Sequence, residues 1–456
     1  MYQKTYHIHF VGIGGIGMSG IAELLLNLGY QVSGSDLKSS DITRRLAGLG
    51  GTVYEGHAAE NIQDADVVVI SSAVKEDNDE VVAARNQSIP VIPRAEMLAE
   101  LMRLKYSVAV AGAHGKTTTT SIVGSVLAAG DLDPTIVIGG KLRSVDTNAV
   151  LGQGNFIVAE ADESDGSFLK MAPSIAVVTN IDREHLDYYD DLKDIVQTFA
   201  RFIDRIPFYG LAVLCLDNEH VQDLIPHIKK RYTTYGVSSQ ANYQAREIHC
   251  DGLYSHYQVY CRGDHLGAIR LNLPGIHNVY NSLASVAVGL ELDIPFDTIK
   301  TGLETLEGVR RRLEIKGSAK GITVIDDYAH HPTEIKTTLQ SVRTSWPDRR
   351  IVGIFQPHRY TRTQALFDEF TRAFYQTDQL VLVPIYSAGE TAIEEISHTL
   401  LCESIQAHGH KAVTCTDSFK EALALLKGEL REGDLVITMG AGDIWKLGET
   451  LLKQLA

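Results

Sequence analysis

The feature that most constrains the fold of this chain is a pattern that opens each of three successive blocks: an apolar strand, a turn and a helix. In the first block, residues 7–12 are predicted to form a buried strand and residues 18–28 a helix. Strands that alternate with helices are typical of βαβ units, whose strands run parallel. We therefore predict an α/β fold. The 456 residues suffice for two to four domains of roughly 100–200 residues each.

The three blocks give three expected domains, at residues 1–105, 106–312 and 313–456. The first and third are predicted to be Rossmann-like, the third with a doubly wound sheet. The second is predicted to be a P-loop ATPase domain with an antiparallel portion, because residues 241–273 change to short alternating stretches. Further strands are predicted at 31–35, 66–71, 106–112, 156–160, 175–179, 322–326, 351–355, 380–383 and 435–439, and a further helix at 278–290.

Composition narrows the possible partners. The formal net charge is −15, so the broad positive field that drives non-specific nucleic-acid binding is absent. No apolar run reaches the roughly 18 residues that a membrane span needs, and the first residues lack a signal-peptide pattern. The five cysteines form no C-x-x-C pair, which suits reduced thiols. We therefore expect a cytoplasmic protein with no nucleic acid and no membrane span; its oligomeric state is left open.

The first glycine motif, Gly12-x-Gly14-x-x-Gly17, directly follows a predicted strand and opens a helix. Its glycines permit a tight turn and a close approach of backbone N–H groups to a pyrophosphate, which the helix dipole also favours. Asp36 ends the second strand, where an acid can bind a ribose hydroxyl. The pattern alone fits NAD binding or a structural turn, but the extra Gly15 departs from a plain dinucleotide fingerprint. The motif indicates a diphosphate ligand without identifying it.

The second motif, Gly112-Ala-His-Gly115-Lys116-Thr117, again lies between a strand and a helix. Its backbone N–H groups can cradle phosphates, Lys116 can reach the β/γ oxygens, and the Thr117 hydroxyl can bind Mg²⁺. The strand–loop–helix context makes a purely structural role a poor alternative. The loop therefore predicts binding of a nucleoside triphosphate.

Polar residues follow two strands of the second block. Glu160 ends one strand and is followed by acids at 162, 163 and 165, and His185 follows the other strand. Ligands bind at the carboxyl ends of such strands, and carboxylate and imidazole groups there can hold Mg²⁺ against phosphates. The alternative is a solvated acidic loop. Glu160 and His185 are the preferred metal ligands because they lie closest to the strand ends.

A fourth set of residues lies later in the chain. His277-Asn278 precedes a helix, and Arg311 and Arg312 lie at the boundary between the second and third blocks. The segments DDYAHHP (326–332) and HRYTR (358–362) each follow a strand of the third block. Arginine suits forked recognition of carboxylate or phosphate. Although such pairs are usually on the surface, these two segments are predicted to meet at one edge of the sheet.

Together, the segments GIGGIGMSGIAE, AGAHGKTTTT, AEADESDGSF, TNIDREHLDYY, DDYAHHPTE and FQPHRYTRT resemble the Mur ligase family, in order along essentially the whole chain. The resemblance implies a nucleotide-sugar domain, an ATP domain and an amino-acid domain. It implies a cytoplasmic step of peptidoglycan precursor synthesis with ATP and Mg²⁺ as cofactors. ATP would phosphorylate the lactyl carboxylate of UDP-N-acetylmuramate, and the amine of L-alanine would attack the acyl phosphate.

The resemblance also implies roles for single residues. The uridine diphosphate portion would be held by Gly14, Gly15, Gly17, Asp36, Ser71 and Ser72. ATP would be bound by Gly112, Gly115, Lys116, Thr117, Thr118, Asn278 and Arg312, with Asp327 at its ribose and Tyr328 near the adenine. The metal would be held by Thr117, Glu160 and His185. The amino-acid and acyl-phosphate end would comprise His330, His358, Arg359 and Arg362, which with Lys116 are the expected catalytic residues.

One departure from the family pattern points to the branch. Several family members that add later residues carry a carbamylated lysine about 15 positions after the histidine that matches His185. Here the region reads TFARF, with Ala200 and Arg201, and Lys193 stands at the wrong spacing. This fits the alanine-adding branch and gives no basis for a carbamate ligand.

Other functions fit less well. The alternative within the family attaches a recycled tripeptide to the same nucleotide sugar. A folylpolyglutamate synthetase would share the ATP domain and the C-terminal domain, but it would leave the additional N-terminal block of this chain unexplained. An NAD-dependent dehydrogenase would leave the lysine–threonine loop unused, and a non-catalytic sensor would not need the metal ligands.

Overall fold

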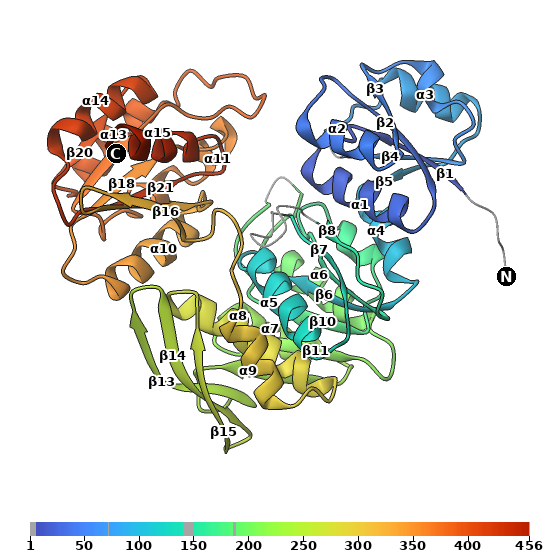
Figure 1. Ribbon diagram of the computed structural model, residues 1–456, viewed down its shortest axis with the longest axis horizontal. Coiled ribbons are helices and arrows are strands. Elements are labelled where there is room, and N and C mark those ends of the chain that lie inside the picture. The colour runs from blue at the N-terminus through green and yellow to red at the C-terminus, as the bar shows by residue number, and fades with distance from the viewer. Residues whose placement is uncertain (1–5, 72, 140–148, 186–187, 456) are drawn as a thin grey trace. The chain divides into compact units, whose positions relative to one another are not determined.

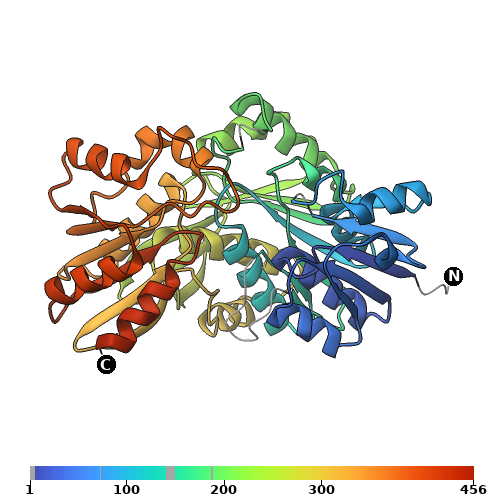
Figure 2. The same cartoon turned by 90° about the horizontal axis from the view of Figure 1, so that it is seen from above.

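The computed structural model describes residues 6–71, 73–139, 149–185 and 188–455, and Figures 1 and 2 show it from two directions. The described residues form three β-sheets with helices connecting their strands. They divide into two compact units. One unit contains the residues up to Arg246, together with Gln258–Ile269 and Tyr280–Glu307, and the other contains Glu247–Tyr257, Arg270–Val279 and the residues from Gly308 onward.

The first sheet is entirely parallel, with strand order β3-β2-β1-β4-β5. Its strands are β1 (His7–Val11), β2 (Gln31–Asp36), β3 (Thr52–Glu55), β4 (Val67–Ile70) and β5 (Val91–Pro93). The connecting helices are α1 (Ile16–Asn27), α2 (Asp41–Gly48), α3 (Asp79–Asn86) and α4 (Arg94–Met102), with a 3-10 turn at Ala59–Ile62. Every residue of β1 is buried, as expected for a central parallel strand covered on both faces.

The second sheet has ten strands, in the order β15-β14-β13-β12-β11-β10-β6-β9-β7-β8. They are β6 (Tyr106–Ala111), β7 (Thr135–Val137), β8 (Ala149–Val150), β9 (Phe156–Glu160), β10 (Ile175–Val178), β11 (Leu211–Cys215), β12 (Tyr232–Gly236), β13 (Tyr243–Asp251), β14 (Tyr254–Cys261) and β15 (Asp264–Leu271). The helices are α5 (Lys116–Ala129), α6 (Leu192–Asp204), α7 (Glu219–Leu224), α8 (Ile276–Glu291) and α9 (Phe296–Glu304), with 3-10 turns at Ser167–Lys170 and Ile225–His227.

The predicted antiparallel portion corresponds to β13, β14 and β15. Two-residue turns at 252–253 and 262–263 join these strands, and a connection this short is possible only between antiparallel neighbours. Positive φ angles at Gly252, Arg262 and Gly263 (54°, 49° and 96°) fit such turns. The parallel part of the sheet continues up to the pairing of β12 with β13.

The third sheet has strand order β16-β17-β21-β18-β19-β20, antiparallel only between β16 and β17. Its strands are β16 (Glu314–Ala319), β17 (Ile322–Asp327), β18 (Ile351–Phe355), β19 (Gln379–Leu382), β20 (Val413–Cys415) and β21 (Leu435–Met439). Its helices are α10 (Pro332–Ser345), α11 (Tyr360–Ala365), α12 (Phe367–Phe370), α13 (His398–Ala407), α14 (Phe419–Glu429) and α15 (Trp445–Leu455).

Successive residues of the third sheet enter two different hydrophobic clusters. Ile351 and Phe355 pack with residues of α10, α12 and α13, whereas Val352 and Ile354 pack with residues of α14 and α15. Helices therefore cover both faces, and the predicted doubly wound sheet is confirmed. The α/β fold class is confirmed as a whole, with mixed parallel and antiparallel sheets. In the described part of the chain, no helix combines the length and apolar character that crossing a membrane requires.

A buried carboxylate lies beside the first sheet. Glu80, on α3, is fully buried and accepts hydrogen bonds from Ser35 Oγ at 2.5 Å and from Asn61 Nδ2 at 2.6 Å. His9 Nε2 lies 3.7 Å from Glu80 Oε1. Burial acts to raise the pKa of Glu80, but the nearby His9 and the hydrogen bonds from Ser35 and Asn61 outweigh it and lower the pKa to about 2. The carboxylate is therefore ionised at neutral pH.

Candidate active site

The loop between β6 and α5 is held in place by the end of strand β10. Asn180 Oδ1 accepts the His114 N–H at 2.9 Å, and Asn180 Nδ2 and Thr179 Oγ1 donate to His114 O at 2.9 and 2.6 Å. Gly112 and Gly115 have φ of 133° and 82°, and a Cβ on Gly112 would lie 2.2 Å from Thr179 Oγ1. Only glycine fits there, so the sequence forms an open anion-binding turn at the start of α5.

Lys116 is the first residue of α5 and points back into this loop. Its Nζ donates to Gly112 O at 2.6 Å and to the Glu163 carboxylate at 2.8 and 3.0 Å. Burial acts to lower the pKa of Lys116, but the facing carboxylate of Glu163 outweighs it and raises the pKa well above its usual value. The ammonium is therefore a fixed positive charge at the phosphate loop.

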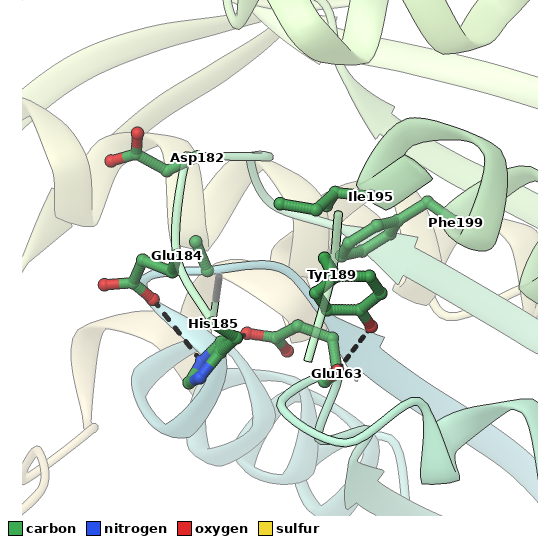
Figure 3. Close-up of a pocket in the computed structure, with 8 residues that line it drawn as sticks. Glu163, Asp182, Glu184, His185, Tyr189, Ile195 and Phe199 are labelled. Carbon is green, nitrogen blue, oxygen red and sulfur yellow. Dashed lines mark hydrogen bonds and ion pairs between the residues drawn. The ribbon is translucent and has the colours of Figure 1, made fainter. Parts of the chain in front are cut away.

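A second group of polar side chains lines a small pocket beside the loop, shown in Figure 3. One ligand atom from each of Glu163, Glu184 and His185 lies within 4.8 Å of the other two. His185 Nε2 is 3.8 Å from Glu163 and 3.7 Å from Glu184. Tyr189 Oη donates to the Glu163 carbonyl at 2.5 Å and fixes the chain there. The two carboxylates and the imidazole form a donor set that suits a divalent cation.

The remaining predicted residues of this region have different surroundings. Thr117 and Thr118 are buried in the first turn of α5. Glu160 ends β9, and its Oε1 accepts the Gly139 N–H at 2.7 Å. Among the described residues, Glu160 does not lie close enough to Glu163, Glu184 and His185 to join that group of potential metal ligands. Its role as a metal ligand stays a prediction.

The first glycine motif forms the expected turn between β1 and α1. Gly12 has φ of 79°, and its N–H donates to Ser35 O at 2.8 Å. Asp36 Oδ2 accepts the Gly14 N–H at 2.9 Å, and a Cβ on Gly14 would lie 2.8 Å from that oxygen. In this structure Asp36 thus holds the glycine loop itself. Gly15 caps α1 with extended backbone and is exposed.

Two serines were also predicted at the diphosphate site. Ser71 follows β4, and its Oγ would lie 3.9 Å from a Cβ on Gly12, which places it beside the loop. Ser72 lies outside the described residues. Arg94, which the sequence argument missed, packs against Gly17, where a Cβ would lie 3.1 Å from its Cδ. Arg94 thus brings a cation to the same turn.

In the second unit, the boundary residues 311–313 are tied to the end of β17. Asp327 is buried, and its Oδ2 accepts the Leu313 N–H at 2.7 Å while Oδ1 accepts the Ala329 N–H at 2.8 Å. Burial raises the pKa of Asp327 to about 6, although Arg312 and these hydrogen bonds oppose the shift. Asp327 therefore organises the backbone here, and its predicted contact with the ribose of ATP stays a prediction.

Arg311 and Arg312 both face the ring of Tyr328, with guanidinium carbons 5.0 and 5.4 Å from its centroid. Arg311 also donates to Asp326 Oδ2 at 2.9 Å. The Tyr328 ring lies 5.3 Å from His330 in an edge-on contact. Tyr328 thus connects the predicted ATP-binding Arg312 with the predicted amino-acid end.

His330, His358 and Arg362 come together as the sequence predicted. The two imidazoles lie 6.1 Å apart, and Arg362 Nη1 lies 3.2 Å from His358 Nδ1. Because guanidinium only donates, His358 Nδ1 must be the acceptor. Burial, with Arg362, His330 and Arg359, lowers the pKa of His358 to about 4. His358 is therefore a neutral imidazole with its proton on Nε2.

His277 and Asn278, expected just before a helix, instead lie in the first turn of α8, because the helix begins at Ile276. Asn278 is buried, and its Nδ2 donates to Pro274 O at 2.7 Å. His277 Nδ1 lies 3.1 Å from Ser341 Oγ, and burial together with Arg312 lowers the pKa of His277 to about 4. His277 therefore lies within electrostatic range of Arg312.

Sequence reasoning missed residues whose role depends on distant partners. Glu163 was not preferred over Glu160, yet it binds Lys116 across 47 positions of the chain. Asn180 directly follows the strand predicted at 175–179, and it holds the phosphate loop. Tyr386, whose ring stacks on His358 at 5.6 Å, gave no signal at all. Only the strand-end position of Asn180 could have identified one of these residues.

Comparison with known proteins agrees with this geometry. Family models described as "Mur ligase family, catalytic domain", "Mur ligase middle domain" and "Mur ligase, glutamate ligase domain" match residues 7–106, 110–289 and 311–442. A relative from Desulfatibacillum aliphaticivorans described as UDP-N-acetylmuramate–L-alanine ligase is 66% identical over 452 residues, 99% of each chain. A relative from Desulfosudis oleivorans with the same description is 64% identical over 99% of each chain.

Solved structures give the same picture. A UDP-N-acetylmuramate–alanine ligase from Thermotoga maritima has a TM-score of 0.83 and 30% identity, covering 98% of each chain. A murein peptide ligase from Psychrobacter arcticus has a TM-score of 0.71 and 24% identity, covering 99% of this chain and 98% of that chain. At that lower identity the likeness concerns the fold alone.

Proposed function

The chain belongs to the Mur ligase family, and from this membership we propose that it joins L-alanine to the lactyl carboxylate of UDP-N-acetylmuramate with ATP as the energy source. The observation that carries the proposal is the β6–α5 loop with its partly buried Lys116. This loop occurs in a chain 66% identical to a relative described as UDP-N-acetylmuramate–L-alanine ligase. Its expected location is the cytoplasm, where ATP is available.

The chemistry needs an activated acid because a carboxylate does not react with an amine. In the proposed reaction, a carboxylate oxygen attacks the γ-phosphorus, ADP leaves, and an acyl phosphate forms. The alanine amine, having lost a proton, then attacks the acyl carbon, and the tetrahedral intermediate expels phosphate. Two anions must approach each other in the first step, so fixed positive charge is the main requirement of the site.

Lys116 supplies part of that charge. In the structure its ammonium is neutralised by Glu163, so the γ-phosphate must compete with this carboxylate for the ammonium. The Gly112–Gly115 backbone, already held by Thr179 and Asn180, offers N–H donors to the neighbouring phosphates. We expect Lys116 to exchange Glu163 for phosphate oxygen when ATP binds.

Mg²⁺ is the cation proposed for this site, because hard oxygen donors dominate it. Thr117, Glu160 and His185 are the proposed ligands, and Glu163 and Glu184 supply the carboxylates nearest to His185. When bound, the ion neutralises phosphate charge that Lys116 alone cannot balance.

At the other end of the reaction, Arg359 and Arg362 are proposed to bind the carboxylate of L-alanine. Forked guanidinium groups match a carboxylate. His358 cannot take a proton readily near neutral pH, because its pKa is about 4. We therefore assign His358 to hydrogen bonding through its Nε2–H and not to proton removal.

The test measures phosphate release from ATP in Mg²⁺ with UDP-N-acetylmuramate, adding L-alanine, the tripeptide or no acceptor. The proposal expects release that depends on both the nucleotide sugar and L-alanine. Release only with the tripeptide would assign the chain to the recycling branch of the family. Release with no acceptor-dependent increase would overturn the ligase assignment.

A further inference from the structure

Residues 386–390 form a short loop that is attached to the chain just before α11. Tyr386 N–H donates to Pro357 O at 2.8 Å, and Arg359 N–H donates to Tyr386 O at 2.9 Å. These paired bonds resemble one rung of a parallel ladder, which is an isolated bridge between His358 and Tyr386. The loop then turns and places Glu390 at the first turn of α11.

Glu390 binds the start of α11 with both carboxylate oxygens. Oε2 accepts the Thr361 N–H at 3.1 Å, and Oε1 accepts the Thr361 hydroxyl at 2.7 Å. Arg359 Nε lies 4.0 Å from Oε1. The N–H groups of a first helical turn have no partners within the helix. Glu390 therefore caps α11 from a loop some thirty residues away in sequence.

The capped segment contains a strained residue. Arg359 has φ of 70° and ψ of 139°, a conformation that residues with a side chain rarely adopt. Such a conformation persists only where surrounding contacts fix it. Here Tyr386 holds the Arg359 N–H, and the Thr363 hydroxyl donates to the Arg359 carbonyl at 2.7 Å.

The same loop fixes the neighbouring imidazole. The Tyr386 ring stacks on His358, with centroids 5.6 Å apart and planes 8° apart. A Cβ on Gly442 would lie 2.7 Å from Tyr386 Cγ, so glycine there leaves room for the ring. His358 is thus held between Tyr386 and Arg362.

We propose that Glu390 is a positioning residue for the amino-acid end of the site: by capping α11 it fixes the strained backbone at Arg359 and the direction of the Arg359 and Arg362 side chains. The inference rests on the proposed function, in which these two arginines bind the carboxylate of L-alanine. Glu390 acts through them, because its own oxygens are occupied by Thr361.

The test compares steady-state kinetics of wild type, Glu390→Ala, Glu390→Gln and Thr361→Val, with Glu395→Ala as matched control because Glu395 is an exposed acid further along the same connection. We expect Glu390→Ala to raise KM for L-alanine about tenfold. Without the cap the first turn of α11 loses its fixed position, and Arg359 and Arg362 are then misplaced for the carboxylate of L-alanine. The KM values for ATP and UDP-N-acetylmuramate should stay within about twofold of wild type, because those ligands bind elsewhere. Glu390→Gln, whose amide oxygen can still accept the Thr361 N–H, should recover most of the loss.

The outcomes separate this inference from the proposed function. Alanine-independent phosphate release by the wild type would overturn the proposed function. The positioning role would be overturned if the wild type uses L-alanine but Glu390→Ala leaves the KM for L-alanine unchanged. It would also be overturned if Glu390→Ala raises the KM values for all three substrates equally. If Glu390→Ala does not fold, Thr361→Val removes one of the two cap bonds and should raise KM for L-alanine by a smaller factor. An unchanged KM in Thr361→Val would then count against the proposal.

Discussion

Replacing Lys116 by methionine should convert Glu163 into a buried carboxylate without a counter-ion. Glu163 is buried, and burial already acts to raise its pKa against the effect of Lys116. Removing one partner of a buried ion pair typically costs about 3–5 kcal/mol. The folded protein can limit this cost by keeping Glu163 protonated. The loss of stability then cannot exceed the free energy of protonating a carboxyl group at the pH of the experiment.

At pH 7 the upper limit on the lost stability is set by the difference between the pH and the ordinary pKa of 4.5 of this carboxyl group. That difference corresponds to about 3.4 kcal/mol at 1.36 kcal/mol per pH unit. In Lys116→Met the folded pKa of Glu163 is raised above the unfolded value. The stability of Lys116→Met relative to wild type is therefore highest below pH 4.5 and falls by about 1.4 kcal/mol per unit as pH rises toward 7.

The assay is urea unfolding in the presence of a chelator at pH 5, 6 and 7, followed by hydrogen exchange of amides in α5. Lys116→Met should lie about 3 kcal/mol below wild type at pH 7 and about 1 kcal/mol below it at pH 5. Lys116→Met/Glu163→Gln should lose most of this pH dependence. Lys193→Met, at an exposed lysine, is the control. A deficit that is equal at all three pH values, or that persists in the double variant, would refute the reasoning.

Four further predictions follow from the structure. Gly112→Ala should weaken ATP binding at least about tenfold by calorimetry, because its Cβ would lie 2.2 Å from Thr179 Oγ1; wild-type affinity would contradict the tight fit. Arg362→Ala should raise KM for L-alanine by about 10–100-fold, as expected for lost charge-assisted hydrogen bonds; an unchanged KM would exclude it from the carboxylate site. Glu80→Gln should lower the free energy of unfolding by about 3 kcal/mol at pH 7, since the Glu80 pKa of about 2 lies below its ordinary 4.5. This deficit should shrink as pH falls from 4.5 toward 2, and a constant deficit would assign it to packing. Chelation of divalent cations should abolish phosphate release and added Mg²⁺ should restore it; activity in chelator would remove the metal from the proposal.

The buried parallel strands could be predicted because their signal is local. Residues 156–160 and 351–355 were predicted with the bounds that β9 and β18 have in the structure. The helix predicted at 18–28 covers Ile16–Asn27, because Gly15 already caps it with extended backbone. Continuous apolar runs between glycine turns leave few alternatives to a buried strand.

Short edge strands could not be predicted in the same way. Strand β3 is mostly exposed, and β16 is only partly buried, so neither has a continuous apolar run. The position of β3 depends on its pairing with β2, from which helix α2 separates it in the chain. The position of β16 depends on its pairing with β17, which follows after a short turn. A periodicity argument sees only the exposed polar residues of such strands.

The candidate site shows the same division. The order of the motifs identified the loop with Lys116, and the strand-end rule brought His330 and His358 to one edge. Which acid would face Lys116 could not be inferred: both acids lie at the end of one strand, yet Glu163 binds Lys116 whereas Glu160 accepts the Gly139 N–H. The local spacing of charges does not determine which one points inward.

The bonds that Thr179 and Asn180 make to the β6–α5 loop have a consequence for the thermodynamics of nucleotide capture. The loop already has its backbone fixed by four hydrogen bonds from the end of β10. A ligand that lands on it therefore does not have to order a flexible segment, an entropic cost that weakens many loop-mediated complexes. We expect the entropy of ATP binding to reflect released water and counter-ions far more than a stiffened chain.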